Sequence, residues 1–160
     1  MNIGKLIHRQ ISVARVYGIP VRIDYRWFLV FGLSVWLISM NLQHGIRGLA
    51  PVDAVTAWAL GVLTTLGLFL SVFGHELSHA LVGRMEGIEI IEIVLHPFGG
   101  LARLRSEPET PGAEFRIAVA GPAASFIFAV LAFGAYQIAL VGDYRTSAAI
   151  LFFIGSGNIL

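Results

Sequence analysis

Three residues within an apolar stretch carry side chains that could do chemistry together: His75, Glu76 and His79, in the segment FLSVFGHELSHALVG. On a helix, residues four apart lie on one face, so the two imidazoles could bind one metal ion, with Glu76 about 100° around the same turn. Neutral imidazole is a good zinc ligand, and a nearby carboxylate can take a proton from water whose pKa the metal lowers to about 7. This HExxH spacing predicts a Zn²⁺ site with His75 and His79 as ligands and Glu76 as catalytic base.

The surroundings of the motif separate a metal site from a chance match. A single HExxH in a soluble protein can be accidental, with its polar groups solvated. Here Glu76 is the only formally charged residue between positions 54 and 82. Placing an ionisable group inside a membrane span costs at least about 2.5 kcal/mol of free energy unless the group is paired or faces a water-filled cavity. The setting therefore favours a functional site.

The composition predicts a membrane protein. The 160 residues are 56% hydrophobic and 13% charged, whereas soluble domains carry about 25% charged residues. The net charge is +1 and no basic tract is interleaved with aromatics, so we expect no nucleic-acid partner. Cysteine is absent, which excludes disulfides and thiolate ligands and leaves His, Asp and Glu to hold a metal.

Long apolar runs predict a polytopic α-helical membrane protein with three full transmembrane helices and part of a fourth. The full spans are expected at residues 25–42, 54–82 and 117–141. The last run, 146–160, would cover roughly 22 Å of a hydrocarbon core about 30 Å thick, so we expect the chain to stop partway through that span. We read His44 as a solvated loop residue. Gly121-Pro122 predicts a local break in the third span, and the small residues at 120–125 suit close contact with the HExxH helix.

Two short β segments are expected at the membrane surface. Residues 11–24 alternate around Tyr17-Gly18, as in a hairpin, and Pro20 would restrict its strand to a sheet edge. Residues 87–106 predict a ribbon of two strands, 88–95 and 101–105, around the turn that follows His96. An open strand edge beside the metal could hold an extended substrate by backbone pairing. We interpret His96 as a structural or substrate-side group rather than a ligand.

The cationic residues predict the orientation. Nine of the eleven lie before the first span or between the second and third, and only Arg47 and Arg145 lie on the opposite side. Because cytoplasmic loops carry the excess of Lys and Arg, the N-terminus and the HExxH end of the second span are expected at the cytoplasmic face of the cell membrane.

Three motifs in order make the chain resemble the site-2 protease family of intramembrane zinc metalloproteases. They are GHELSHA at 74–80, HPFGG at 96–100 after a strand, and AGPAAS at 120–125 at the start of the next helix. The N-terminal VARVYGIPVRIDYRW also resembles the branch that usually carries cystathionine-synthase-type (CBS) modules.

The resemblance implies a zinc metalloendopeptidase that cleaves membrane-spanning segments of other proteins, often regulators held at the membrane. It implies that His75 and His79 bind zinc, that Glu76 acts as general base, and that the ribbon helps to present the substrate. The candidate substrate-binding residues are Ile93, Val94, Leu95, Phe98, Gly99 and Gly100. The expected partners are therefore a membrane-anchored protein substrate and the lipid bilayer, and formation of an oligomer is left open.

The family's third zinc ligand is an aspartate of an Asp-Gly motif in a later helix, and residues 1–160 contain no such motif. We therefore expect an incomplete metalloprotease core that is inactive by itself. No spacing singles out a substitute ligand among Asp53, Glu86, Glu89, Glu92, His96 and Asp143. The alternative is a catalytically inactive membrane module of the same ancestry that binds a metal or a partner helix.

Overall fold

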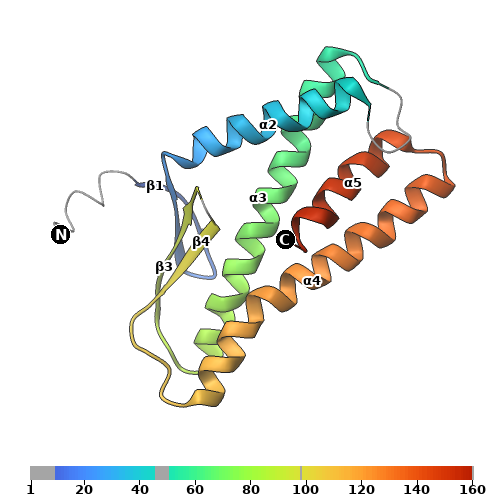
Figure 1. Cartoon of the computed structure of the whole chain (residues 1–160). Coiled ribbons are helices and arrows are strands. Elements are labelled where there is room, and N and C mark those ends of the chain that lie inside the picture. Colours follow the sequence, from blue (N-terminus) through green and yellow to red (C-terminus); the bar gives the residue numbers. More distant parts are fainter. Residues whose placement is uncertain (1–9, 46–50, 98, 160) are drawn as a thin grey trace. The chain divides into compact units, whose positions relative to one another are not determined.

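The computed structural model describes residues 10–45, 51–97 and 99–159. Several residues used above lie outside these ranges: Lys5, Arg9, Arg47 and Phe98. In chain order the described elements are β1 (Gln10–Val16), β2 (Ile19–Asp24), α2 (Trp27–His44), α3 (Ala54–Met85), β3 (Ile90–His96), β4 (Gly99–Leu104), α4 (Pro111–Val141) and α5 (Arg145–Gly157). Figure 1 labels all of these except β2.

Three helices, α2, α3 and α4, are long and apolar enough to cross a membrane. Only 22–28% of the most apolar 18-residue segment of each helix is buried inside the protein. Most of the apolar surface of these helices therefore faces outward. A soluble protein rarely exposes such large apolar patches, whereas lipid accommodates them. The helix α3 has 32 residues and is therefore about 48 Å long, which exceeds a hydrocarbon core of about 30 Å.

The helix α3 begins at the predicted residue, Ala54, but continues three residues past the predicted end of the second span at Val82, to Met85. Gly87 follows the helix in the left-handed conformation with φ +82°. The Ile88 N–H donates to the Gly83 carbonyl at 2.9 Å, and the Gly87 N–H donates to the Arg84 carbonyl at 3.0 Å. This pair of bonds is a Schellman motif, which satisfies the last carbonyls of the helix.

The expected break at Gly121-Pro122 is wrong, because α4 runs without interruption from Pro111 to Val141 with Pro122 inside it. Proline removes one backbone donor, but the turns on either side keep their own hydrogen bonds and hold the helix together. The helix also begins six residues before the predicted span. Thr110 caps it by accepting a hydrogen bond from the Ala113 N–H at 3.2 Å, and Pro111 occupies the first turn, where a missing donor costs nothing.

The loop assignment of His44 is also wrong, since His44 is the last residue of α2. Its Nδ1 lies 2.7 Å from the Met40 carbonyl one turn earlier. An imidazole near a helix C-terminus can satisfy one of the unpaired carbonyls there, which favours extending the helix by this residue.

The four strands form one sheet in the order β1-β2-β3-β4. The pairs β1–β2 and β3–β4 are antiparallel hairpins, and β2 joins β3 in parallel, with Val21 opposite Ile93. At the first turn both Tyr17 and Gly18 have positive φ, as in a type I′ turn. The two ribbons that the sequence predicts separately are thus parts of a single sheet, and β2 and β3 are its inner strands.

Pro20 is therefore not on an edge strand, contrary to the expectation. It pairs with Arg15 of β1 but lies before the parallel pairing with β3, which starts at Val21. The missing N–H of proline costs no ladder bond there, because the inner side of β2 is unpaired at this position.

The described residues fall into two packed units. The first contains residues 10–30 and Val72–Ala124, with the whole sheet and the HExxH segment. The second contains residues Phe31–Ser71 and 125–159, and its buried core consists of Ile38, Leu42, Ala57, Leu60 and Ala149.

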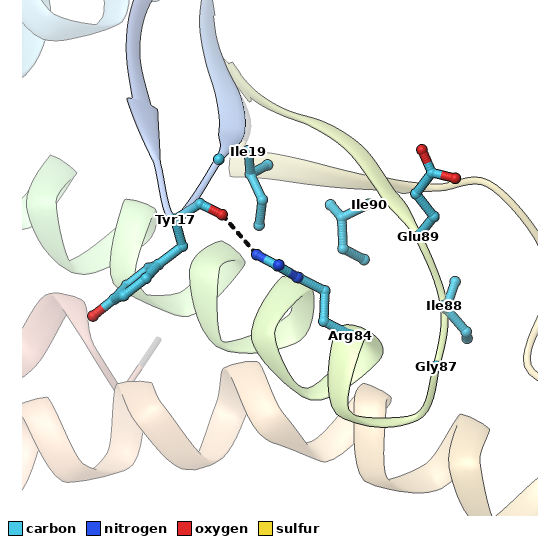
Figure 2. Close-up of a pocket in the computed structure, with 8 residues that line it drawn as sticks. Tyr17, Ile19, Arg84, Gly87, Ile88, Glu89 and Ile90 are labelled. Carbon is cyan, nitrogen blue, oxygen red and sulfur yellow. Dashed lines mark hydrogen bonds between the residues drawn. The ribbon is translucent and has the colours of Figure 1, made fainter.

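In the first unit, a groove lies between the β1–β2 turn and the connection from α3 to β3. Figure 2 shows Arg84 reaching from α3 toward the Tyr17 carbonyl, to which its Nη1 donates at 2.7 Å. Tyr17 holds a positive φ of 49°, a conformation that non-glycine residues rarely adopt. The arginine therefore ties the turn of the N-terminal hairpin to the end of the HExxH helix.

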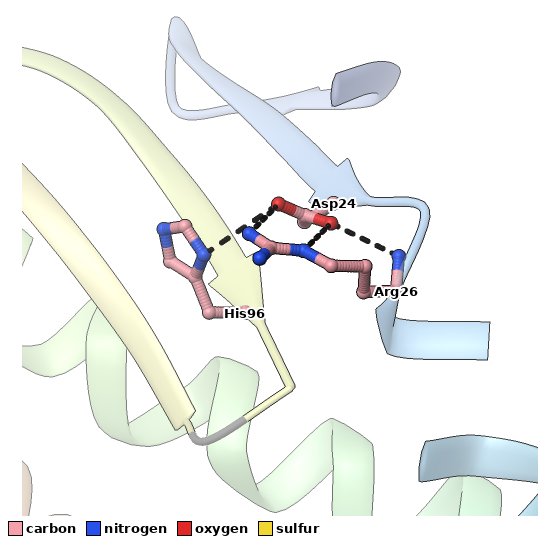
Figure 3. A network of polar contacts seen from close by, with 3 residues as sticks. All are labelled: Asp24, Arg26 and His96. Carbon is pink, nitrogen blue, oxygen red and sulfur yellow. Dashed lines mark hydrogen bonds and ion pairs between the residues drawn. The ribbon is translucent and has the colours of Figure 1, made fainter. Parts of the chain in front are cut away.

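The ends of β2 and β3 meet at a buried carboxylate, Asp24, which is 2% exposed. Arg26 donates to it from Nε, Nη2 and the backbone N–H at 2.8–3.0 Å, and His96 Nδ1 lies 3.9 Å from Oδ2 (Figure 3). His96 is the last residue of β3 and stands beside the turn of the β3–β4 hairpin, next to this carboxylate. The hydrogen bonds from Arg26 lower the pKa of Asp24 from 3.8 to about 2.

Asp24→Asn is expected to lower the free energy of unfolding by about 1–2 kcal/mol at neutral pH, a figure reduced for the partial exposure of Arg26. Because the folded-state pKa is the lower one, the stabilisation is present above 3.8 and is lost as pH falls toward about 2. Denaturant unfolding of both proteins in detergent at neutral and acidic pH measures the difference. A gap between variant and wild type that stays constant down to the lowest pH would contradict this assignment.

Candidate metal centre

The histidine pair is positioned by the regular geometry of α3. His75 and His79 lie one turn apart, with ring centroids 4.8 Å apart and Nε2 atoms separated by 3.1 Å. Two ligands bound at about 2.0–2.1 Å in a tetrahedral zinc site are about 3.3 Å from one another. The two nitrogen atoms are therefore already at the spacing that a shared zinc ion requires.

A backbone carbonyl orients the second histidine. His79 Nδ1 lies 2.6 Å from the carbonyl oxygen of Ile117 on α4. A carbonyl can only accept, so Nδ1 carries the proton, and in the neutral ring Nε2 keeps its lone pair. Metal-binding histidines usually donate their other ring N–H to such an acceptor.

A glycine provides the space in front of the two imidazoles. A Cβ atom added at Gly121 would overlap Nε2 of both His75 and His79. The prediction that the small residues of AGPAAS allow close contact with the HExxH helix is confirmed at this position. The donor set, its spacing and the glycine together fit a zinc ion bound by the two Nε2 atoms.

Glu76 is buried beside strand β4, with 8% of its surface exposed. Its Oε2 accepts a hydrogen bond from the Ala102 N–H at 3.2 Å. A Cβ atom at Gly100 would overlap the Cγ of Glu76, so only glycine lets the strand come this close. The carboxylate is thus held against the hairpin by the Ala102 N–H.

The predicted site residues separate into two groups. His75, Glu76 and His79 lie together on α3, and Gly99 and Gly100 lie on β4. Ile93, Val94 and Leu95 lie in β3, where they pair with strands on both sides and are at most 6% exposed. These three residues therefore have no open backbone edge for pairing with an extended segment, whereas β4 is an outer strand of the sheet.

Four contributors to the site were either missed in the sequence or predicted in another role. The Ala102 N–H and the Ile117 carbonyl are backbone groups, whose roles have no signature in residue type. Gly100 was predicted only as a substrate contact, and Gly121 only as a packing residue. Their presence in the motifs HPFGG and AGPAAS was the available signal.

The described residues supply two ligands rather than three. Within residues 10–45, 51–97 and 99–159, no group of three or more His, Cys, Asp or Glu side chains is arranged to hold a metal ion. The six substitutes considered above all lie in these ranges, so none of them joins His75 and His79. A catalytic zinc site usually has three protein ligands and one open position.

Known proteins resemble the chain across these elements. It is 39% identical over 124 residues to a Synechocystis protein named "Putative zinc metalloprotease sll0528". The matched region covers 78% of this chain and 32% of that protein. It is 33% identical over 121 residues to "Zinc metalloprotease MJ0392" of Methanocaldococcus jannaschii, covering 76% of this chain and 31% of that protein. The chain thus spans about a third of the length of these curated relatives.

A solved structure gives the same result in three dimensions. The site-2 protease from Methanocaldococcus jannaschii superposes with a TM-score of 0.59 and 26% identity, over 94% of this chain and 69% of that one. The model of peptidase family M50 matches residues 63–153, a stretch that contains the histidine pair, the adjacent carboxylate and Gly121. On the strength of this match and of the site inside it, the chain belongs to peptidase family M50, the family of the site-2 proteases.

Proposed function

We propose that these residues form the core of a zinc-dependent intramembrane endopeptidase that cleaves membrane-spanning segments of protein substrates. The observation that carries the proposal is the pair of Nε2 atoms 3.1 Å apart, on a helix apolar enough to cross a membrane and next to a buried carboxylate. The Ile117 carbonyl leaves His79 Nε2 with its lone pair, and this atom lies beside His75 Nε2 at about the spacing of two nitrogen atoms bound to one zinc ion.

His75 and His79 would hold the zinc ion through Nε2. Bound there, zinc would polarise the carbonyl of the scissile peptide and lower the pKa of water. The hydrogen bond from His79 to Ile117 keeps the proton on Nδ1 and leaves Nε2 available to the metal. We propose that the third protein ligand is the later aspartate that the family resemblance implies, because the described residues supply only two.

Glu76 would act as the general base. Its carboxylate would take a proton from the attacking water and pass it to the nitrogen of the leaving amine as the peptide bond breaks. The Ala102 N–H holds Oε2 in place at 3.2 Å during both transfers. Burial of the group excludes bulk water, which strengthens its interaction with charge that develops beside it.

The outer edge of β4 is the proposed substrate-binding surface. In an antiparallel pair, alternate residues direct their backbone groups toward and away from the neighbouring strand. Ala102 directs its N–H toward Glu76, and Gly100 belongs to the same alternate set. An extended substrate segment pairing with β4 at Gly100 would bring its backbone to the base, while the Ala102 N–H stays with Glu76. A membrane-spanning helix must first unwind, since its internal hydrogen bonds shield its peptides.

We propose that the site lies toward the cytoplasmic side of the cell membrane in a multi-pass protein. His75 is 21 residues after the start of α3, or about 31 Å along the helix axis, so it lies near the far end of a span. The excess of cationic residues on that side supports a cytoplasmic position. A substrate released there would enter the cytoplasm, as regulated intramembrane proteolysis requires.

The two-ligand set favours a second candidate function: an inactive module that binds metal or a partner helix through the same residues. The two functions predict different results when the metal is removed and then added back.

For the peptidase, a chelator such as phenanthroline should abolish cleavage of a membrane-anchored reporter, and added Zn²⁺ should restore it. The assay uses the purified full-length protein in lipid, with His75→Ala as the metal-free reference. Zinc binding without cleavage of any membrane-anchored reporter would favour the inactive module.

A further inference from the structure

A bidentate ion pair fastens the beginning of α4 to the end of the HExxH helix. Arg116 donates from Nε to Glu86 Oε1 at 2.6 Å and from Nη2 to Oε2 at 2.7 Å. Glu86 follows α3 directly, and its own N–H donates to the Val82 carbonyl at 3.0 Å. The parallel hydrogen bonds of such a pair fix orientation as well as distance. They also lower the pKa of the Glu86 carboxyl, so the pair is charged at neutral pH.

This pair is one residue away from the contact that orients His79. Ile117, the next residue after Arg116, provides the carbonyl that accepts from His79 Nδ1 at 2.6 Å. Gly121, one turn further along α4, provides the space in front of both Nε2 atoms. Sliding or rotating α4 against α3 would change both features at once, and Arg116–Glu86 is the charged contact beside them.

Two more Arg–Glu contacts in this unit show what is particular to Arg116. Arg105 pairs with Glu89 through a single nitrogen at 2.7 Å, and both side chains are more than 60% exposed. Glu89 directly precedes β3 and Arg105 directly follows β4. Arg103 pairs with Glu92 between neighbouring strands at 2.8 Å. Neither contact joins the two helices that carry the histidines and Gly121. The Glu89–Arg105 pair therefore serves as a matched control.

We infer that Arg116 and Glu86 are positioning residues for the metal centre: their pairing holds the Ile117 carbonyl and Gly121 against His79 and so sets the affinity and geometry of zinc binding. This inference rests on the proposed function, since it needs zinc at the histidine pair. Partners behind metal ligands typically change metal affinity about 10- to 100-fold. We expect a loss near the lower end, about tenfold, because this pair acts on His79 through a backbone carbonyl.

The experiment measures metal binding directly and does not depend on turnover. The purified full-length protein in detergent is titrated with Zn²⁺ against a chromogenic chelator, and the visible spectrum of the Co²⁺-loaded protein reports the ligand geometry. The variants are Glu86→Gln, Arg116→Gln and the swap Glu86→Arg with Arg116→Glu, beside the controls Glu89→Gln and Arg105→Gln. The swap places a cation at the end of α3 and an anion in an early turn of α4, which the helix dipoles tolerate.

If positioning is the cause, both single variants weaken Zn²⁺ binding about tenfold and alter the Co²⁺ spectrum, the swap recovers most of the loss, and both controls stay within about twofold of wild type. Long-range electrostatics would instead move Glu86→Gln and Arg116→Gln in opposite directions, which would overturn the inference, as would wild-type binding in both. If the single variants aggregate, a folded swap with weak zinc binding also overturns it. If the wild-type protein binds zinc no more tightly than the His79→Ala variant does, the proposed function itself is refuted. If the wild type binds zinc and the single variants bind it equally well, only the positioning role is refuted and the proposed function stands.

Discussion

Replacing Glu76 by glutamine is expected to reduce cleavage of a membrane-anchored substrate by about a thousandfold or more, with zinc still bound. General acid–base catalysis contributes about 10²–10⁴-fold to the rate, and the amide of glutamine cannot accept a proton from water at neutral pH. Glutamine has nearly the same shape as glutamate, and its carbonyl oxygen can still accept from the Ala102 N–H, which lies 3.2 Å from Oε2. The loss would therefore report proton transfer rather than a change in packing.

The measurement combines single-turnover cleavage by the full-length protein with the zinc content of the same preparation. Glu89→Gln removes an exposed carboxylate of the same unit and should leave both values unchanged. A variant at Glu76 that cleaves at the wild-type rate would show that another group is the base. A variant that loses zinc along with activity would assign Glu76 to the metal centre as a ligand.

Replacing Gly121 by alanine is expected to weaken metal binding strongly. The added methyl group would overlap Nε2 of His75 and of His79, the two atoms proposed to bind zinc. His79 cannot turn away without losing its hydrogen bond to Ile117. We expect Zn²⁺ affinity to fall at least about 100-fold, at the upper end of the loss caused by disturbing the partners of metal ligands.

The chain offers a control for this substitution in the same helix. A Cβ at Gly134 of α4 meets nothing within 4 Å, so Gly134→Ala should bind zinc normally. Alanine favours helix over glycine by about 1 kcal/mol, so both substitutions help the helix equally and only one blocks the histidines. Thermal unfolding in detergent together with zinc titration compares the two. Equal zinc affinity in both variants would contradict the proposed position of the metal.

The two predictions also bear on whether the chain belongs to a peptidase or to an inactive relative. The peptidase and an inactive module that binds metal both require the Gly121→Ala result, because both hold the metal at the histidine pair. Only the peptidase requires the Glu76→Gln result, because only catalysis needs a base. Carrying out both experiments on the full-length protein therefore separates metal binding from cleavage.

The sequence was sufficient for features that depend on residues close together in the chain. The spacing of His75, Glu76 and His79 determines their common face on any helix, and the apolar runs predict three helices able to cross a membrane. The Tyr17-Gly18 turn follows equally from local alternation. The break expected at Gly121-Pro122 was also a local prediction, and it was wrong: proline weakens a helix, but the neighbouring turns keep their hydrogen bonds and the helix continues.

Only the tertiary structure decided which strand has an open edge and which backbone groups reach the site. Ile93, Val94 and Leu95 became inner-strand residues because β2 pairs with β3 across about 70 residues of sequence, a pairing that no local pattern encodes. The Ile117 carbonyl, the Ala102 N–H and the space at Gly121 depend likewise on how α4 and β4 approach α3. By itself, the sequence determined the residues that could bind zinc and activate water. Long-range packing determined how those residues are oriented. A backbone carbonyl, a backbone N–H or a glycine affects a side chain only when the fold places it next to that side chain.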